Sequence, residues 1–130
     1  MLEESVAAIM NTDIKIFGVT ALTSLSDSDT SYIYKRQAEE QVLAMIELAT
    51  KSNIHGVVCS PQELSLVKNN SNLLTITPGI RLKSLGDDQT RVMTPKEAIS
   101  NGSDFLVIGR PITASNSIKN SLKEIYDSIQ

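Results

Sequence analysis

The stretch TPGIR at residues 77–81 and the stretch VIGRP at residues 107–111 decide the fold of this 130-residue chain. Each closes an apolar run with a glycine followed by an arginine. Backbone N–H groups can approach an anion at such a glycine, while the guanidinium supplies charge and a forked set of donors. If the two runs are neighbouring parallel strands, their ends meet at one edge of the sheet. The pattern predicts a phosphate-binding site around Arg81, Gly109 and Arg110.

Short β-rich runs alternate with helical periodicity along the chain. Four runs are rich in β-branched residues and carry little polar alternation, at residues 14–22, 56–59, 73–77 and 105–108. Such runs are typical of parallel strands in βα units. We therefore predict an α/β fold with four parallel strands in one sheet, in a chain that has roughly half the length of a typical (β/α)8 barrel. In that barrel the loops after the seventh and eighth strands form the usual phosphate site.

Helical segments separate these runs. Two apolar sets recur at three- and four-residue spacing and predict stripes that pack on the sheet, namely Ala38, Val42, Met45, Ile46 and Ala49, and Ile118, Leu122, Ile125 and Ile129. Two helix starts carry a cap hydroxyl, a proline and a reciprocal glutamate, at residues 60–63 and 94–97. Gly102 suits the left-handed residue that closes the second of these helices. Residues 2–10 are predicted to be the last turns of a helix.

Composition and motifs exclude several classes of function. A formal charge of -3 gives no electrostatic surface for nucleic acid or an anionic membrane, and no apolar run reaches membrane-spanning length. Dinucleotide-binding and P-loop signatures are missing, as are clusters of metal ligands, so neither a cofactor nor a metal is expected. With a single cysteine and no leader-like opening, the cytoplasm is the expected compartment.

Several reactive residue types have ordinary interpretations. His55 has no catalytic or metal-ligating partner at motif spacing, so a catalytic role is not expected. Cys59 is expected to be a small buried hydrophobe. Asp27 and Asp29 fall in a serine-rich stretch and are expected to form a turn.

Six motifs, in order, resemble bacterial-type orotidine 5'-phosphate decarboxylase. They are GVTALTS at 18–24, GVVCS at 56–60, TPGIR at 77–81, GDDQ at 86–89, MTP at 93–95 and VIGRP at 107–111. That family converts orotidine monophosphate to uridine monophosphate and carbon dioxide without a cofactor, in pyrimidine biosynthesis. The resemblance implies a single carboxy-terminal half-barrel domain over residues 1–130, corresponding to the fifth to eighth βα units and carrying the phosphate-binding loops.

The resemblance also implies contacts with the pyrimidine ring. Thr23 corresponds to the hydroxyl that hydrogen-bonds the pyrimidine. Pro78 and Ile80 correspond to an apolar wall near the ring. This chain is therefore expected to supply part of the ring contact.

Four further residues correspond to phosphate-proximal positions of the family. Gln89 matches the side chain that reaches over the bound nucleotide to its phosphate. Gly109 matches a backbone N–H donor and Arg110 the guanidinium, while Arg81 lies among the substrate-binding positions nearby. Contacts with a non-reacting phosphate can organise a closed, dry site and so lower the barrier at the ring.

The family's catalytic array does not match any part of this chain. That array alternates Asp and Lys and includes an Asp-x-Lys-x-x-Asp motif, whose lysine protonates the carbanion left by carbon dioxide. The local lookalike, DIK at 13–15, lies at the start of the first predicted strand, at the opposite, stabilising face of such a barrel, and has no second Asp following it. The resemblance therefore implies no catalytic residue here, and the isolated chain is expected to be inactive.

Three hypotheses remain open. The chain is a decarboxylase fragment that works with an amino-terminal half barrel, a self-associating half barrel that binds phosphate without catalysis, or a non-functional relic. The expected ligand is orotidine or uridine monophosphate, or a phosphate ion. The expected protein partner is the amino-terminal half barrel or a second copy of the chain, so a homo-oligomer is expected.

Overall fold

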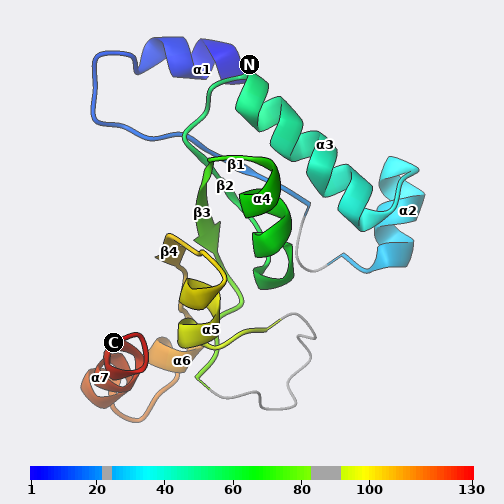
Figure 1. Ribbon diagram of the computed structural model, residues 1–130. Coiled ribbons are helices and arrows are strands. Elements are labelled where there is room, and N and C mark those ends of the chain that lie inside the picture. The colour runs from blue at the N-terminus through cyan, green and yellow to red at the C-terminus, as the bar shows by residue number, and fades with distance from the viewer. Residues whose placement is uncertain (22–24, 83–91) are drawn as a thin grey trace.

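Four short parallel strands form one sheet in the order β1-β2-β3-β4 (Figure 1). The structure, a computed structural model, describes residues 1–21, 25–82 and 92–130. The strands are β1 (Phe17–Val19), β2 (Gly56–Val58), β3 (Leu74–Thr77) and β4 (Phe105–Leu106). The helices are α1 (Leu2–Ala8), α2 (Asp27–Tyr34), α3 (Ala38–Lys51), the 3-10 turn η1 (Pro61–Glu63), α4 (Leu64–Asn70), α5 (Pro95–Ser100), α6 (Arg110–Thr113) and α7 (Ile118–Ser128). The predicted parallel α/β sheet is confirmed.

The strands are shorter than the apolar runs that predict them, because pairing depends on neighbours. Before β1, the backbone N–H of Ile16 donates to the His55 side chain at Nδ1, 3.0 Å away, instead of to a strand partner. After β3, Pro78 has no N–H to donate. The ladder between β3 and β4 is therefore brief, although Val107 N–H still donates to Thr77 O at 2.9 Å.

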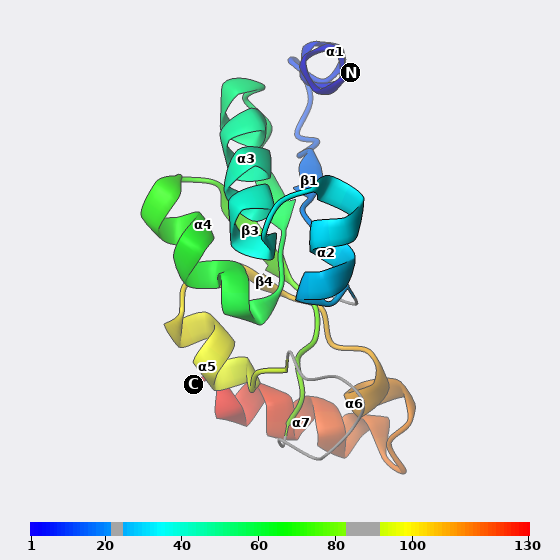
Figure 2. The same ribbon diagram turned by 90° about the vertical axis from the view of Figure 1, so that its right-hand side faces the viewer.

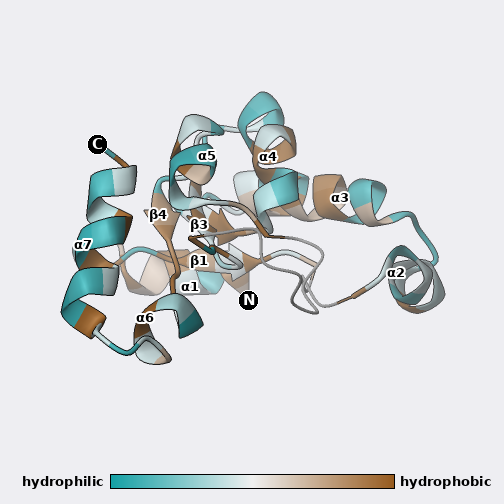
Figure 3. Cartoon of the chain, turned by 90° about the horizontal axis from the view of Figure 1, so that it is seen from below, coloured by the Kyte–Doolittle hydropathy of each residue, from teal (hydrophilic) through white to brown (hydrophobic). Residues whose placement is uncertain are grey.

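Helices α3, α4 and α5 lie along one face of the sheet (Figure 2). Viewed from the carboxyl ends of the strands, α3, α4, α5 and α7 follow an arc outside them (Figure 3). Side chains from α3, α4 and β2 form the centre of the core, including Val42, Ile46, Val57, Leu64 and Val67. The stripe predicted on α3 is confirmed at Val42, Ile46 and Ala49, which are buried.

The stripe predicted on the last helix is not packed as expected. Of the four apolar residues of this stripe only Ile125 is buried, while Ile118 and Leu122 of α7, and Ile129 directly after it, are exposed. The periodicity correctly predicts an amphipathic helix. The expectation that its whole stripe packs on the sheet was wrong for the part of the chain that the structure describes.

Helix caps follow the sequence closely, although the sequence patterns did not predict α2 or α6. Thr94 and Glu97 form the predicted capping box of α5, and Gly102 has the expected left-handed backbone, with φ 94°. Asp27 and Asp29 were expected to form a loop turn, but they lie at the start of helix α2. Ser26 and Asp29 cap that helix reciprocally, so the serine-rich stretch is a helix start.

A hydrogen-bond network at the amino ends of β3 and β4 joins them to α4. The Asp104 carboxylate accepts from Lys68 Nζ at 2.7 Å, from Thr75 N–H at 2.8 Å and from the Thr75 hydroxyl at 3.0 Å. Lys68 also donates to Leu73 O at 3.1 Å. The network fixes the start of each strand, at the end of the sheet opposite the two arginine-bearing stretches.

Candidate functional site

The two arginine-bearing stretches follow neighbouring strands and leave the same edge of the sheet. Thr77 of β3 and Leu106 of β4 are register partners in a parallel pair. Arg81 follows the carboxyl end of β3, and Arg110 follows that of β4 at the start of α6 (Figure 1). The topology therefore places both arginines where ligands of parallel α/β sheets bind, outside the carboxyl ends of the strands.

The segment carrying Arg81 is held by backbone hydrogen bonds to residues that precede α5. Gly79 has φ 79°, a left-handed conformation that favours glycine. Arg81 N–H donates to Met93 O at 3.0 Å, and Ile80 and Met93 form an isolated parallel bridge. The Arg81 guanidinium donates through Nη1 to Ile80 O at 3.0 Å.

Gly109 and Arg110 form the turn from β4 into α6. Gly109 O accepts from Ile112 N–H at 2.8 Å and from Thr113 N–H at 3.1 Å, which closes the first turn of the helix. A Cβ built on Gly109 would meet no atom within 4 Å, so the space beside this backbone is open. Arg110 itself is exposed.

Two of the predicted site residues, Thr23 and Gln89, lie outside the described residues, as does the rest of the GDDQ motif. The prediction for Ile80 was wrong. Its side chain is fully buried and belongs to the hydrophobic core, so it offers no surface to a ring. Pro78 is half-buried. The burial of Ile80 goes with its backbone bridge to Met93, a contact that no local sequence pattern predicts.

The carboxyl end of β2 is a packed region rather than a reactive one. Burial, together with the charge of Glu63, raises the pKa of the Cys59 thiol to about 12, although Lys68 works in the other direction. The Thr20 hydroxyl donates to Val58 O at 3.0 Å and to the Glu63 carboxylate at 3.4 Å. At neutral pH the Cys59 thiol is protonated and fully buried, so it cannot serve as a nucleophile.

Two hollows in the described part of the chain are lined by residues other than the arginines. One, of about 700 Å³, lies where the start of α3 faces η1 and α4. The other, of about 660 Å³, borders β1, α1 and α3. Within the described ranges, no group of three or more His, Cys, Asp or Glu side chains is placed to hold a metal ion. The same part of the chain has no helix with the length and apolarity needed to span a bilayer.

Comparison with known proteins gives a consistent result. The family model for "Orotidine 5'-phosphate decarboxylase / HUMPS family" matches residues 1–125. The orotidine 5'-phosphate decarboxylase of Wolbachia pipientis subsp. Culex pipiens (strain wPip) is 43% identical, over 99% of this chain and 58% of its own length. That of Dictyoglomus thermophilum is 44% identical, over 88% of this chain and 51% of its own length.

Solved structures agree with the sequence relatives. The crystal structure of orotidine 5'-phosphate decarboxylase from Lactobacillus acidophilus superposes with a TM-score of 0.80 and 31% identity, covering 100% of this chain and 58% of that one. The Pyrococcus horikoshii OT3 enzyme, with a TM-score of 0.67 and 21% identity, shows the same fold. The half-barrel prediction is thus confirmed, and the chain spans little more than half the length of the relatives it matches. The chain belongs to the orotidine 5'-phosphate decarboxylase / HUMPS family.

Proposed function

We propose that this chain is the phosphate-binding half of an orotidine 5'-phosphate decarboxylase, acting in pyrimidine nucleotide biosynthesis. The observation that carries the proposal is the placement of Arg81 and Arg110 after neighbouring parallel strands, at one edge of the sheet. The open space beside Gly109 supports it, because an anion needs room to approach that backbone.

The chemistry of the ligand follows from the donors. A guanidinium offers planar, paired N–H groups that match two oxygens of a phosphate, and such charge-assisted bonds are stronger than neutral ones. Arg81 is oriented by its bond to Ile80 O, which reduces the conformational freedom lost when a ligand binds. In this proposal Arg81, Gly109 and Arg110 hold the phosphate of orotidine monophosphate, Gln89 closes over that phosphate, and Thr23 contacts the pyrimidine.

Decarboxylation itself is assigned to residues outside this chain. Asp13 and Lys15 are exposed and precede β1, at the amino end of the sheet, far from the strand ends that carry the arginines. His55 uses Nδ1 to accept the Ile16 N–H, which is a structural role. The binding half supplies contacts with the non-reacting phosphate. With an Asp/Lys array on the other half of the barrel, these contacts would lower the barrier to decarboxylation at the ring.

Two measurements test the proposal. The purified chain alone should not decarboxylate orotidine monophosphate. Turnover at a rate typical of enzymes would refute the claim that the chain lacks the catalytic residues. Calorimetric titration with uridine monophosphate should give binding that Arg110→Ala weakens by roughly 10- to 150-fold, as expected for the loss of a charge-assisted contact. Arg36→Ala, at an exposed arginine between α2 and α3, is the matched control and should bind normally. Equal affinity of wild type and Arg110→Ala for uridine monophosphate would contradict the assignment of Arg110 to the phosphate site.

A further inference from the structure

Two buried threonines lie on one face of β3. Thr75 and Thr77 occupy alternate positions of the strand, so their side chains point to the same face. Both are fully buried, and Thr75 is the register partner of the core residue Val57. A buried hydroxyl needs a hydrogen-bond partner, because an unpaired one costs stability. The partners of the two hydroxyls differ, and so does the part of the molecule that each one holds.

The Thr75 hydroxyl belongs to the amino end of the sheet. It accepts from Asp104 N–H at 3.1 Å and donates to the Asp104 carboxylate at 3.0 Å. These bonds are part of the network with Lys68 that fixes the starts of β3 and β4. Thr75 therefore accounts for the fold of this region and has no contact with the strand ends that carry the arginines.

The Thr77 hydroxyl pairs with Ser103 instead. The two hydroxyl oxygens lie 2.6 Å apart and are buried. Ser103 Oγ also donates to Phe105 O at 3.1 Å. A serine hydroxyl has a single hydrogen, so Ser103 donates to Phe105 O and accepts from Thr77. Ser103 N–H donates in turn to Ala98 O at 2.9 Å, so the end of α5 holds the residue that orients Thr77.

Thr77 is also the point from which the two arginine-bearing stretches separate. It is the last residue of β3, and the chain runs on from it through Pro78 and Gly79 to Arg81. Its carbonyl accepts from Val107 N–H at 2.9 Å, shortly before the chain reaches Arg110. A shift of Thr77 would therefore move the roots of both stretches relative to each other.

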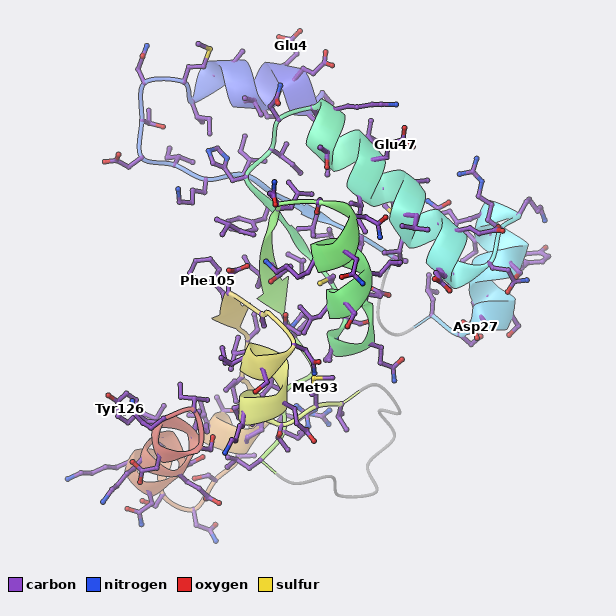
Figure 4. All side chains as sticks on the ribbon, viewed as in Figure 1. Glu4, Asp27, Glu47, Met93, Phe105 and Tyr126 are labelled. Carbon is purple, nitrogen blue, oxygen red and sulfur yellow. The ribbon has the colours of Figure 1, made fainter. Side chains whose placement is uncertain are left out.

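Helix α5 has an anchor for the first of these stretches at each end. Met93 precedes the helix, and Met93 O accepts from Arg81 N–H at 3.0 Å. Ser103 follows the helix and accepts from the Thr77 hydroxyl at 2.6 Å. Figure 4 shows Met93 beside α5 and below the β3 arrow. The segment from Thr77 to Arg81 is thus held at its start and at its end by residues that flank one helix.

We propose that Thr77 is a positioning residue of the phosphate site: its hydroxyl, held by Ser103, fixes the spacing between the stretches that carry Arg81 and Arg110. Two guanidinium groups bind one phosphate well only when the backbone holds them at the right separation, and small displacements of such groups are costly. The inference rests on the proposed function, which assigns the phosphate to these two arginines.

The first test needs no ligand. Site-resolved amide hydrogen exchange is measured by NMR for wild type and Thr77→Val, with the amides of α3 reporting unfolding of the whole core. The amides of Val107 and Arg81 should exchange at least about tenfold faster in the variant, beyond any change in α3. Thr75→Val is the matched control, since it removes a hydroxyl from the same strand, face and degree of burial. It should leave these two amides unchanged relative to α3.

The second test is calorimetric titration with uridine monophosphate. Thr77→Val should weaken binding by about tenfold, and Thr77→Ser, which restores the hydroxyl, should recover most of the affinity. Thr75→Val should lower the free energy of unfolding in urea but bind as wild type does. A merely structural role of the Thr77 hydroxyl would lower stability in both valine variants and leave the affinity of the folded protein unchanged.

Ser103→Ala approaches the same pair from its other side. It should weaken binding as Thr77→Val does, and the double variant should bind no more weakly than Thr77→Val alone, because both changes remove one interaction. Unchanged exchange at Val107 and Arg81, additive losses in the double variant, or an equal loss of affinity in Thr75→Val would each overturn the proposal. If wild type does not bind uridine monophosphate, the proposed function fails, and the exchange measurement still decides whether Thr77 holds the two stretches.

Discussion

The rings of Phe17 and Phe105 meet edge to face, with centroids 6.1 Å apart and planes at 88°. They come from β1 and β4, the first and last strands in the sheet, so the pair spans the sheet face opposite the one that packs on α3 and α4. Gly56 of β2 is the register partner of Phe17. A Cβ on Gly56 would lie 2.5 Å from the Phe17 ring, so this glycine provides the space in which the ring lies. Edge-to-face packing of this kind stabilises beyond the area that it buries.

Gly56→Ala should destabilise the fold. The added Cβ would lie 2.3 Å from Leu74 O as well as against Phe17, and a backbone oxygen in a sheet cannot move aside cheaply. We expect a loss of about 2–3 kcal/mol in the free energy of unfolding, measured by urea titration. Gly18→Ala is the control, because its Cβ would meet only the Cδ1 end of Ile54, at 3.0 Å. Equal losses in the two variants would contradict the role given to Gly56.

The parallel order of the sheet could be predicted because its signals are local. Apolar β-rich runs and the capping box at Thr94 and Glu97 each specify structure within a few residues, and the structure has both. The strand lengths could not be predicted, since β1 begins only after Ile16, whose N–H donates to the His55 side chain. That bond joins residues far apart in sequence. The α2 start was missed because the capping pair Ser26 and Asp29 also fits a turn.

For the candidate site, too, the sequence predicted the local features but not the contacts between distant residues. The glycine and arginine of each stretch mark strand ends, and consecutive βα units place those ends on neighbouring strands, as found for Arg81 and Arg110. The burial of Ile80 was not predictable, since it follows from a bridge to Met93 across an intervening segment. Periodicity likewise shows that α7 has an apolar face but not what covers that face.

The Cys59 thiol should be unreactive in the folded protein. It is 1% exposed, and burial raises its pKa to about 12. Iodoacetamide at pH 8 should label it only as fast as the chain unfolds, with full labelling in denaturant, followed by mass spectrometry. Rapid stoichiometric labelling in native buffer would show that the β2 end is accessible.

The same pKa shift has a consequence for stability in base. The folded state holds the thiol protonated above its ordinary pKa of 9.0, so the unfolded state binds fewer protons there. The free energy of unfolding should therefore fall as pH rises from about 9 towards 12. Cys59→Ala should lessen this slope, which urea titrations at several pH values would measure. An identical slope in the variant would assign the effect to other groups.

The Asp104 network should contribute stability that acid removes. Partial burial works to raise the pKa of Asp104, but hydrogen bonds from Lys68 and Thr75 outweigh it and lower the pKa from its ordinary 3.8. Because the folded pKa is lowered, this contribution is present above about pH 4 and is lost as pH falls through the folded value. Asp104→Asn should cost about 1 kcal/mol at pH 7, since solvent screens a partly exposed pair.

Urea titrations at pH 7 and pH 3 measure both parts of that expectation. Wild type should lose more stability than Asp104→Asn between the two pH values. Glu47→Gln is the control, because Glu47 pairs with Lys51 within one exposed turn of α3. Its unfolding midpoint at pH 7 should match wild type. A midpoint for Asp104→Asn equal to wild type at both pH values would show that the network is dispensable.

Substitutions on α7 should cost different amounts of stability at its buried position and at its exposed apolar positions. Ile125 is buried, so Ile125→Ala should lower the free energy of unfolding by about 2 kcal/mol or more. Leu122 lies one turn earlier and is exposed, so Leu122→Ala should cost less than about 0.5 kcal/mol in the chain alone. Thermal and urea unfolding of wild type and the two variants measure these differences. A large cost for Leu122→Ala in the chain alone would mean that α7 packs against its own sheet in solution.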